Sequence, residues 1–107
     1  MKSFDQLIRD KRREKQHTIR SLEKALWENQ GVHASRSLIN LMEMGKRKPT
    51  YEIAFALADE LGIDSKTALR AAYLARVAFD ENREKGYLAK LIYEKKIAGF
   101  DIEDIVK

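Results

Sequence analysis

The sequence has 107 residues, of which 44% are hydrophobic and 36% are charged, with five glycines, one proline and no cysteine. This length suits one domain with a short extension, the lack of cysteine excludes disulfides and thiolate metal sites, and the scarcity of glycine and proline favours an all-α fold. No apolar run approaches the roughly 20 residues that span a bilayer, and the first residues lack the apolar stretch of a signal peptide, so we expect a cytoplasmic protein with no membrane partner.

The net charge of +4 is unevenly distributed along the chain. Residues 1–48 hold 12 Lys and Arg against 6 Asp and Glu, whereas residues 49–107 hold 9 against 11. A basic half joined to a mildly acidic half indicates a face that meets a polyanion. An unevenly charged solvated surface explains the same distribution equally well, so charge alone does not decide between the two.

Apolar residues at helical spacing predict two helices in the first part of the chain. The first helix begins after Ser3, a good N-cap, and continues to about Lys15. The second begins after Thr18 and continues to about Asn29, where Gly31 supplies a residue that tolerates positive φ.

A third helix is predicted between Ser35, its N-cap, and Gly45. Its apolar stripe, within about 100° of the helical wheel, consists of Leu38, Ile39 and Met42. The opposite face carries Arg36, Ser37, Asn40, Leu41 and Met44. Three consecutive cations and the only proline follow the helix, and they are Lys46, Arg47, Lys48 and Pro49.

Two longer helices are predicted next. Thr50 caps a fourth helix that Gly62 closes, and Asp64 or Ser65 caps a fifth that continues to about Arg83. The fifth helix is apolar on more than one face, so we expect it to need two packing partners. Its apolar positions are Leu69, Ala72, Tyr73, Leu74, Val77, Ala78 and Phe79.

The last part of the chain is predicted to hold two short helices. The segment 84–86 (Glu-Lys-Gly) has the composition of a break, and a sixth helix follows from about Tyr87. Gly99 breaks the pattern again, and Asp101 can cap a short last helix.

The run from Ser35 to Pro49 resembles the recognition helix and following loop of the phage repressor and Cro family, also called the Xre family. The family pattern there is Ser-Arg-x-x-Ile-x-x-x-Glu-x-Gly-x-x-x-Pro, which this chain matches. The resemblance extends over residues 3–75. It implies a five-helix, repressor-like helix-turn-helix DNA-binding domain in residues 1–75 and a helical extension in residues 76–107. It also implies a transcriptional regulator, more specifically a repressor, that binds double-stranded DNA in a sequence-specific manner.

The outward face of the third helix supplies the candidate base contacts. An α-helix fits the major groove, and an Arg such as Arg36 can fork onto guanine O6 and N7. Ser37 can donate or accept, the amide of Asn40 suits adenine, and Leu41 suits a thymine methyl. By resemblance, the positions of Arg36, Ser37 and Leu41 face the bases. A polar solvated face is the alternative interpretation.

The candidate phosphate contacts flank this helix. Ser35 stands at a helix N-terminus, where free N–H groups and the helix dipole favour an anion. Lys46, Arg47 and Lys48 follow the helix, where the DNA backbone would lie, and would set affinity and salt dependence. A solvated basic loop is the alternative.

The resemblance also implies a structural ion pair. In the family, an Arg at the position of Arg12 reaches a Glu at the position of Glu43 and ties the first helix to the recognition helix. We therefore expect Arg12 and Glu43 to support function indirectly, by fixing the recognition helix.

The chain departs from the family pattern between the second and third helices. The family usually has Ala after the Leu of its second helix, but here Leu22 is followed by Glu23, and the connection to Ser35 is several residues longer. Either the second helix is longer or the tight turn has become a loop. The only tryptophan, Trp27, is expected to pack under this enlarged turn.

No motif indicates catalysis or a cofactor. His17 and His33 are isolated, without a second His or a carboxylate at ligand spacing, so we expect no metal site. A Ser-His-Asp arrangement, a glycine-rich phosphate loop and a metal-hydrolase motif are all missing from the sequence. We therefore expect a protein that is not an enzyme.

The apolar content of residues 76–107 exceeds that of a solvated tail. These residues either extend the core of a monomer or form the interface of a homodimer. A homodimer would place two recognition helices about 34 Å apart and require a palindromic operator.

Two other functions remain open on the sequence. The fold could serve as a module that binds a protein partner, as in an antitoxin or an antirepressor. Non-specific binding of nucleic acid is a further alternative, although the chain lacks an aromatic platform for RNA or single strands.

Overall fold

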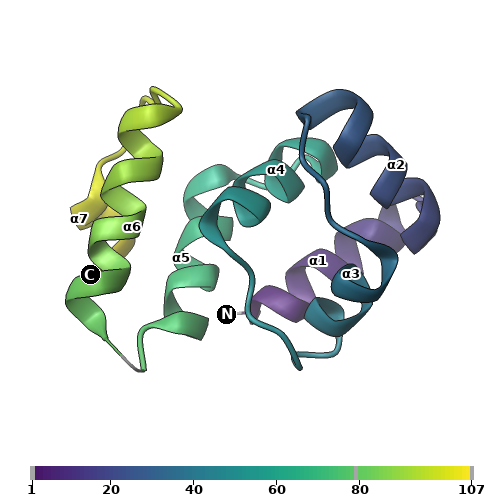
Figure 1. Cartoon of the computed structure of the whole chain (residues 1–107), viewed down its shortest axis with the longest axis horizontal. Helices are drawn as coiled ribbons and strands as arrows, with labels where there is room; N and C mark the ends of the chain where they lie inside the picture. The colour runs from purple at the N-terminus through teal and green to yellow at the C-terminus, as the bar shows by residue number, and fades with distance from the viewer. Residues whose placement is uncertain (1, 79, 107) are drawn as a thin grey trace.

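The computed structural model describes residues 2–78 and 80–106, and over these residues the chain forms seven α-helices and no strand (Figure 1). The helices are α1 (Phe4–Glu14), α2 (Ile19–Gln30), α3 (Arg36–Glu43), α4 (Tyr51–Leu61), α5 (Ser65–Arg76), α6 (Glu81–Glu94) and α7 (Ile102–Val106). The all-α fold class predicted from composition is therefore confirmed. Within the same residues, no helix has both the length and the apolar character needed to cross a membrane.

Local capping sets where α2, α3 and α4 begin and where α2 and α4 end. The hydroxyls of Thr18, Ser35 and Thr50 each accept a hydrogen bond from the backbone N–H three residues later, at 3.0, 3.1 and 3.2 Å. Gly31 and Gly62 end α2 and α4 with φ of +64° and +71°. Glycine adopts this left-handed conformation without steric strain, so both helices stop at the residues that the sequence indicated.

The predicted boundary between the fifth and sixth helices is wrong. Helix α5 ends at Arg76 rather than near Arg83, and α6 begins at Glu81, where the carboxylate of Asp80 accepts from the N–H of Arg83 at 3.1 Å. The segment 84–86, predicted as a break, lies inside α6. Its glycine costs a helix about 1 kcal/mol relative to alanine, which packing of the inward face can offset. The predicted packing of Phe79 falls outside the described residues.

All seven helices contribute to one hydrophobic core. In Figure 1, α4 and α5 lie in the middle, with α1, α2 and α3 on one side and α6 and α7 on the other. Helices α6 and α7 add buried Leu88, Leu91 and Ile105 to this core. The radius of gyration, 13.0 Å, is that of a compact domain of this length. Residues beyond 75 thus extend the core instead of forming a detached tail.

Two carboxylates are buried in this core. Among residues 2–78 and 80–106, Glu43 and Glu84 are the only buried charged side chains, with 4% and 6% of their surface exposed. A buried charge is tolerated when it is paired and hydrogen-bonded, and in the same residues every buried side-chain nitrogen or oxygen has a hydrogen-bond partner. The partners of these two carboxylates determine how α3 and α6 are held.

Candidate nucleic-acid interface

Helix α3 divides cleanly into an inner and an outer face. Ile39 and Met42 are buried in the core, and Leu38 packs against it. The outer positions Arg36, Ser37 and Asn40 are exposed, whereas Leu41 is only half-buried. Of the four candidate base-contacting residues, three are therefore exposed to solvent and the fourth is partly exposed.

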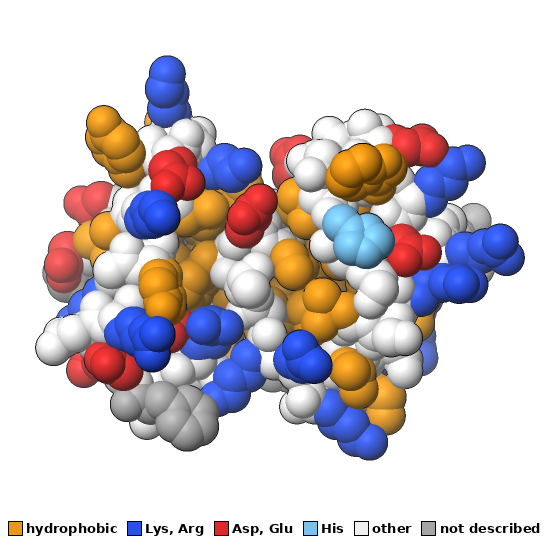
Figure 2. Space-filling model, viewed as in Figure 1, with side chains coloured by type: hydrophobic (Ala, Val, Ile, Leu, Met, Phe, Trp, Pro, Cys, Tyr) orange, Lys and Arg blue, Asp and Glu red, His pale blue; other side chains and the backbone are white. Residues whose placement is uncertain are grey.

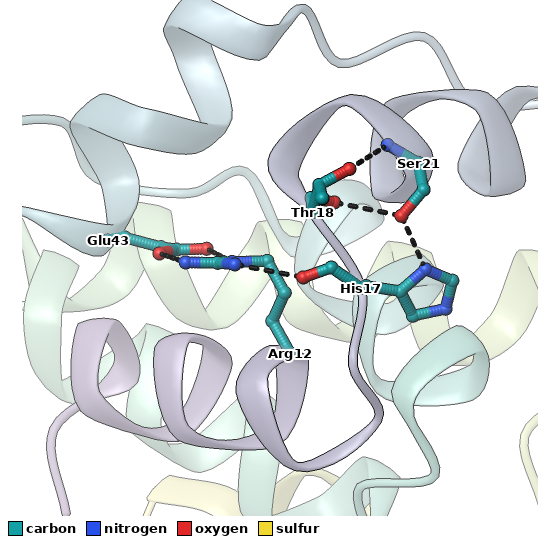
Figure 3. Close-up of polar contacts among 5 residues, drawn as sticks. All are labelled: Arg12, His17, Thr18, Ser21 and Glu43. Atoms are coloured by element: carbon teal, nitrogen blue, oxygen red, sulfur yellow. Dashed lines mark hydrogen bonds and ion pairs between the residues drawn. The ribbon is translucent and has the colours of Figure 1, made fainter.

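Glu43, the last residue of α3, connects the C-terminal end of this helix to α1. Its carboxylate accepts two hydrogen bonds from Arg12, from Nε to Oε2 at 2.6 Å and from Nη2 to Oε1 at 2.8 Å, as Figure 3 shows. The remaining arm of the guanidinium, Nη1, donates to the carbonyl of His17 at 2.9 Å. The side chains of Arg12 and Glu43 are 13% and 5% exposed, so this bidentate pair is largely removed from water.

The pair is charge-assisted and connects three segments. Hydrogen bonding to Glu43 is the main cause that raises the pKa of Arg12 above its usual value, against an opposing effect of burial. The bond to His17 carries the connection into the turn between α1 and α2. At the start of α2, the backbone N–H and the hydroxyl of Ser21 donate to Oγ1 and to the carbonyl of Thr18, at 3.0 and 3.1 Å, and Oγ of Ser21 lies 2.9 Å from Nδ1 of His17 (Figure 3). The orientation of α3 is thus set by side chains that come from outside it.

The basic segment 46–48 follows α3 directly. Gly45 has φ of +71°, and the N–H groups of Lys46 and Arg47 both donate to the carbonyl of Leu41, at 2.9 and 3.3 Å. The side chains of all three cations are exposed. Pro49 is buried behind them, and its carbonyl accepts from Nη1 of Arg76 at 3.0 Å. In Figure 2, Lys and Arg side chains are spread over the face shown, and several of them lie along its lower part, where Figure 1 places the loop after α3.

The connection between α2 and α3 combines both alternatives raised by the sequence. Helix α2 extends through Gln30, and residues 31–35 then form a loop that buries the side chains of Val32 and Ala34. Trp27 is 62% exposed, so the prediction that it packs under the turn is wrong. It follows buried Leu26 by one residue, and this 100° step turns it away from the inward stripe.

Sequence reasoning missed one residue of this surface. Glu23 of α2 accepts a hydrogen bond at Oε2 from the backbone N–H of Arg36, at 3.2 Å, and its Oε1 lies 3.6 Å from Nε of the same arginine. The departure from the family pattern at this position was visible in the sequence. Its contact was not, because the two residues lie 13 positions apart on different helices.

Ser35 keeps the local role that its position indicates. Its Oγ accepts from the N–H of Leu38 at 3.1 Å, which leaves its own hydroxyl hydrogen to donate to an anion. Within residues 2–78 and 80–106, no group of three or more His, Asp or Glu side chains has the arrangement of a metal site. The groups that this surface offers to a ligand are its exposed polar and cationic side chains.

Comparisons with known proteins identify no relative. No protein-family model, no curated protein and no solved structure matches this chain.

Proposed function

We propose that the protein binds double-stranded DNA in a sequence-specific manner and regulates transcription, acting as a repressor with a helix-turn-helix of the phage repressor and Cro type. The observation that carries the proposal is the division of α3. Its inner face is fixed by the core and by the bond between Arg12 and Glu43, while its outer face presents Arg36, Ser37 and Asn40 to solvent. A rigidly held helix with a polar outer face suits insertion into the major groove.

Base recognition is assigned to the outer face. Arg36 has the guanidinium that forks onto guanine, and Asn40 has the amide that pairs with adenine. Ser37 adds a donor or acceptor, and the half-buried Leu41 offers an apolar edge to a thymine methyl.

Phosphate binding is assigned to Ser35 and the segment Lys46–Lys48. Its three exposed cations lie beside the C-terminal end of the helix proposed to enter the groove. Such contacts position a protein on DNA without reading sequence. Each phosphate neutralised adds about −0.9 to the slope of log K against log salt concentration.

Selection of random duplex DNA on the purified protein tests this function, with Arg36→Ala and Lys66→Ala run in parallel. Lys66 is an exposed cation at the start of α5 and controls for the loss of one charge. We expect a base motif for the wild type and for Lys66→Ala, and loss of part of that motif for Arg36→Ala. A wild-type protein that enriches no motif would contradict the proposal.

We further propose that the DNA-binding form is a homodimer on a palindromic operator. Exposed Tyr87 and Tyr93 on α6, 43% and 85% accessible, offer apolar surface for an isologous contact. Two α3 helices would then read half-sites about 34 Å apart. Sedimentation at micromolar concentration separates a dimer from a single 12.4 kDa chain.

A second candidate function is a module that binds a protein partner, as an antitoxin or antirepressor does. Exposed Trp27 favours it, since large aromatic side chains are enriched at protein interfaces. Co-purification with the product of a neighbouring gene, lost in Trp27→Ala, would support this function. We propose no catalytic role for the chain.

A further inference from the structure

One carboxylate of α2 contacts both the backbone and the side chain of the residue assigned to guanine. Glu23 accepts the N–H of Arg36 at Oε2, at 3.2 Å, and holds Nε of Arg36 3.6 Å from Oε1. The side chain of Glu23 is 30% exposed and that of Arg36 is 60% exposed. Glu23 is thus the more fixed of the two, and Arg36 extends outward from it.

This contact changes the electrostatics at the start of α3. The N–H of Arg36 is capped by Glu23 and the N–H of Leu38 by Ser35. These groups would otherwise attract an anion to the positive end of the helix dipole. The carboxylate of Glu23 stands beside Arg36, so a DNA phosphate that approaches Arg36 meets a negative charge. The phosphate contact assigned to Ser35 is made by its hydroxyl hydrogen and not by these capped N–H groups.

The same contact restricts how Arg36 can bind. An arginine forks equally well onto a phosphate and onto the O6 and N7 of guanine. With Nε paired to Glu23 at 3.6 Å, the two terminal nitrogens of Arg36 remain for a ligand. The ion pair thus favours arrangements of Arg36 beside Glu23 before DNA arrives, and the adjacent carboxylate opposes the phosphate-binding mode of Arg36.

We propose that Glu23 is a specificity-determining residue for DNA recognition. It positions Arg36 for guanine and repels the backbone phosphates that would hold Arg36 on any sequence. This inference rests on the proposed function, because it concerns the same helix and the same ligand, double-stranded DNA. Glu23 acts through Arg36. It lowers the affinity for unrelated duplexes and thereby increases the preference of the protein for its operator.

The test compares Glu23→Gln with Glu28→Gln. Both remove one negative charge from α2, but Glu28 pairs with Lys24 at 3.8 Å and is 56% exposed. Dissociation constants are measured for the selected operator and for an unrelated duplex of equal length, between ~50 and ~200 mM salt. Glu23→Asp is added because it keeps the charge but shortens the side chain. Far-UV circular dichroism checks that each variant is folded.

We expect Glu23→Gln to bind the unrelated duplex about fivefold more tightly than the wild type does. Its slope of log K against log salt concentration should steepen by about 0.9, the value for one further phosphate contact. The preference for the operator should fall by about tenfold, at the base pair that Arg36→Ala also loses. Glu23→Asp should lose preference without this gain in non-specific affinity. Glu28→Gln should change both affinities by the same factor.

Two results would overturn the inference in distinguishable ways. In the first, the wild type prefers its operator, and Glu23→Gln prefers it over the unrelated duplex by the same factor as Glu28→Gln does. Glu23 is then only a helix cap, while the proposed function stands. If the wild type binds all duplexes equally, the proposed function fails and the inference fails with it.

Discussion

Arg76 and Glu84 form an ion pair across the break between α5 and α6, with Nε of Arg76 2.6 Å from Oε1 of Glu84. The same carboxylate oxygen accepts from the hydroxyl of Tyr51 at 2.9 Å. Arg76 also donates to the carbonyl of Pro49, and its guanidinium carbon lies 5.4 Å from the centre of the Tyr51 ring. One arginine thereby joins the loop after α3, the start of α4 and the first turns of α6.

Loss of this pair should destabilise the fold. Arg76→Ala leaves Glu84 buried with Tyr51 alone, and we expect a loss of about 2–4 kcal/mol, reduced from the value for a fully buried pair because Arg76 is 24% exposed. Urea denaturation measures the change. Arg83→Ala is the matched control, because Arg83 bonds the exposed Tyr87 hydroxyl at 2.8 Å, and it should shift the midpoint far less. Equal midpoints for both variants would contradict this account.

The bond between Arg12 and Glu43 gives a second stability prediction. Arg12→Ala leaves a carboxylate that is 5% exposed without its charged partner, which should cost about 3–5 kcal/mol of unfolding free energy. Arg13→Ala, at the exposed neighbouring position, should stay within about 0.5 kcal/mol of the wild type. The double variant Arg12→Met with Glu43→Leu should recover most of the loss, since apolar side chains of similar size suit this site. An unchanged thermal midpoint in Arg12→Ala would show that the pair contributes nothing to stability.

Alkaline pH should destabilise the fold through Tyr51. Burial, followed by the hydrogen bond to Glu84, raises the pKa of Tyr51 above its ordinary value of about 10. The unfolded chain therefore releases this proton at lower pH than the folded chain does. The stabilisation is fully present below about pH 10 and is lost as pH rises toward the folded pKa. Denaturation midpoints measured from pH 8 upward should fall more steeply for the wild type than for Tyr51→Phe, and parallel curves would contradict this.

The segment Lys46–Lys48 should control affinity without controlling sequence preference. Changing all three cations to Gln should weaken binding to every duplex and reduce the salt slope by up to about 2.7, the value for three phosphates. The control changes Lys66, Lys95 and Lys96 to Gln, which alters net charge equally around a hollow between α5 and the end of α6. Fluorescence anisotropy across salt concentrations measures both. A control that loses as much slope as the test variant would indicate a general charge effect.

Features set by neighbours in the chain could be predicted from the sequence. Thr18, Ser35 and Thr50 act as caps through hydrogen bonds that span three residues, and Gly31 and Gly62 end helices through their own φ. These are local interactions, so a pattern of residue types indicates them. The division of α3 into two faces was accessible for the same reason, because it follows from a periodicity of 3.6 residues.

Features set by distant contacts could not be predicted in this way. The segment 84–86 has the composition of a break, but it is helical, and Glu84 is buried with hydrogen bonds from Arg76 and Tyr51. The role of Glu23 depends on a residue of another helix. The contact between Arg12 and Glu43 was indicated only by resemblance to a family, since spacing gives no reason for residues 31 positions apart to meet.

The division of α3 has a consequence for how its surface can change. The core contacts and the buried ion pair of α3 are made on its inner side, by Ile39, Met42 and Glu43, while Ser35 and Glu23 cap N–H groups of its first turn. Substitutions at exposed positions away from such contacts usually alter stability by less than about 0.5 kcal/mol. Ser37 and Asn40 can therefore be exchanged for other polar residues while the helix stays in place. The outer face of α3 can therefore acquire new polar side chains by mutation, and with them a new binding preference, without a loss of stability that the rest of the fold would have to offset.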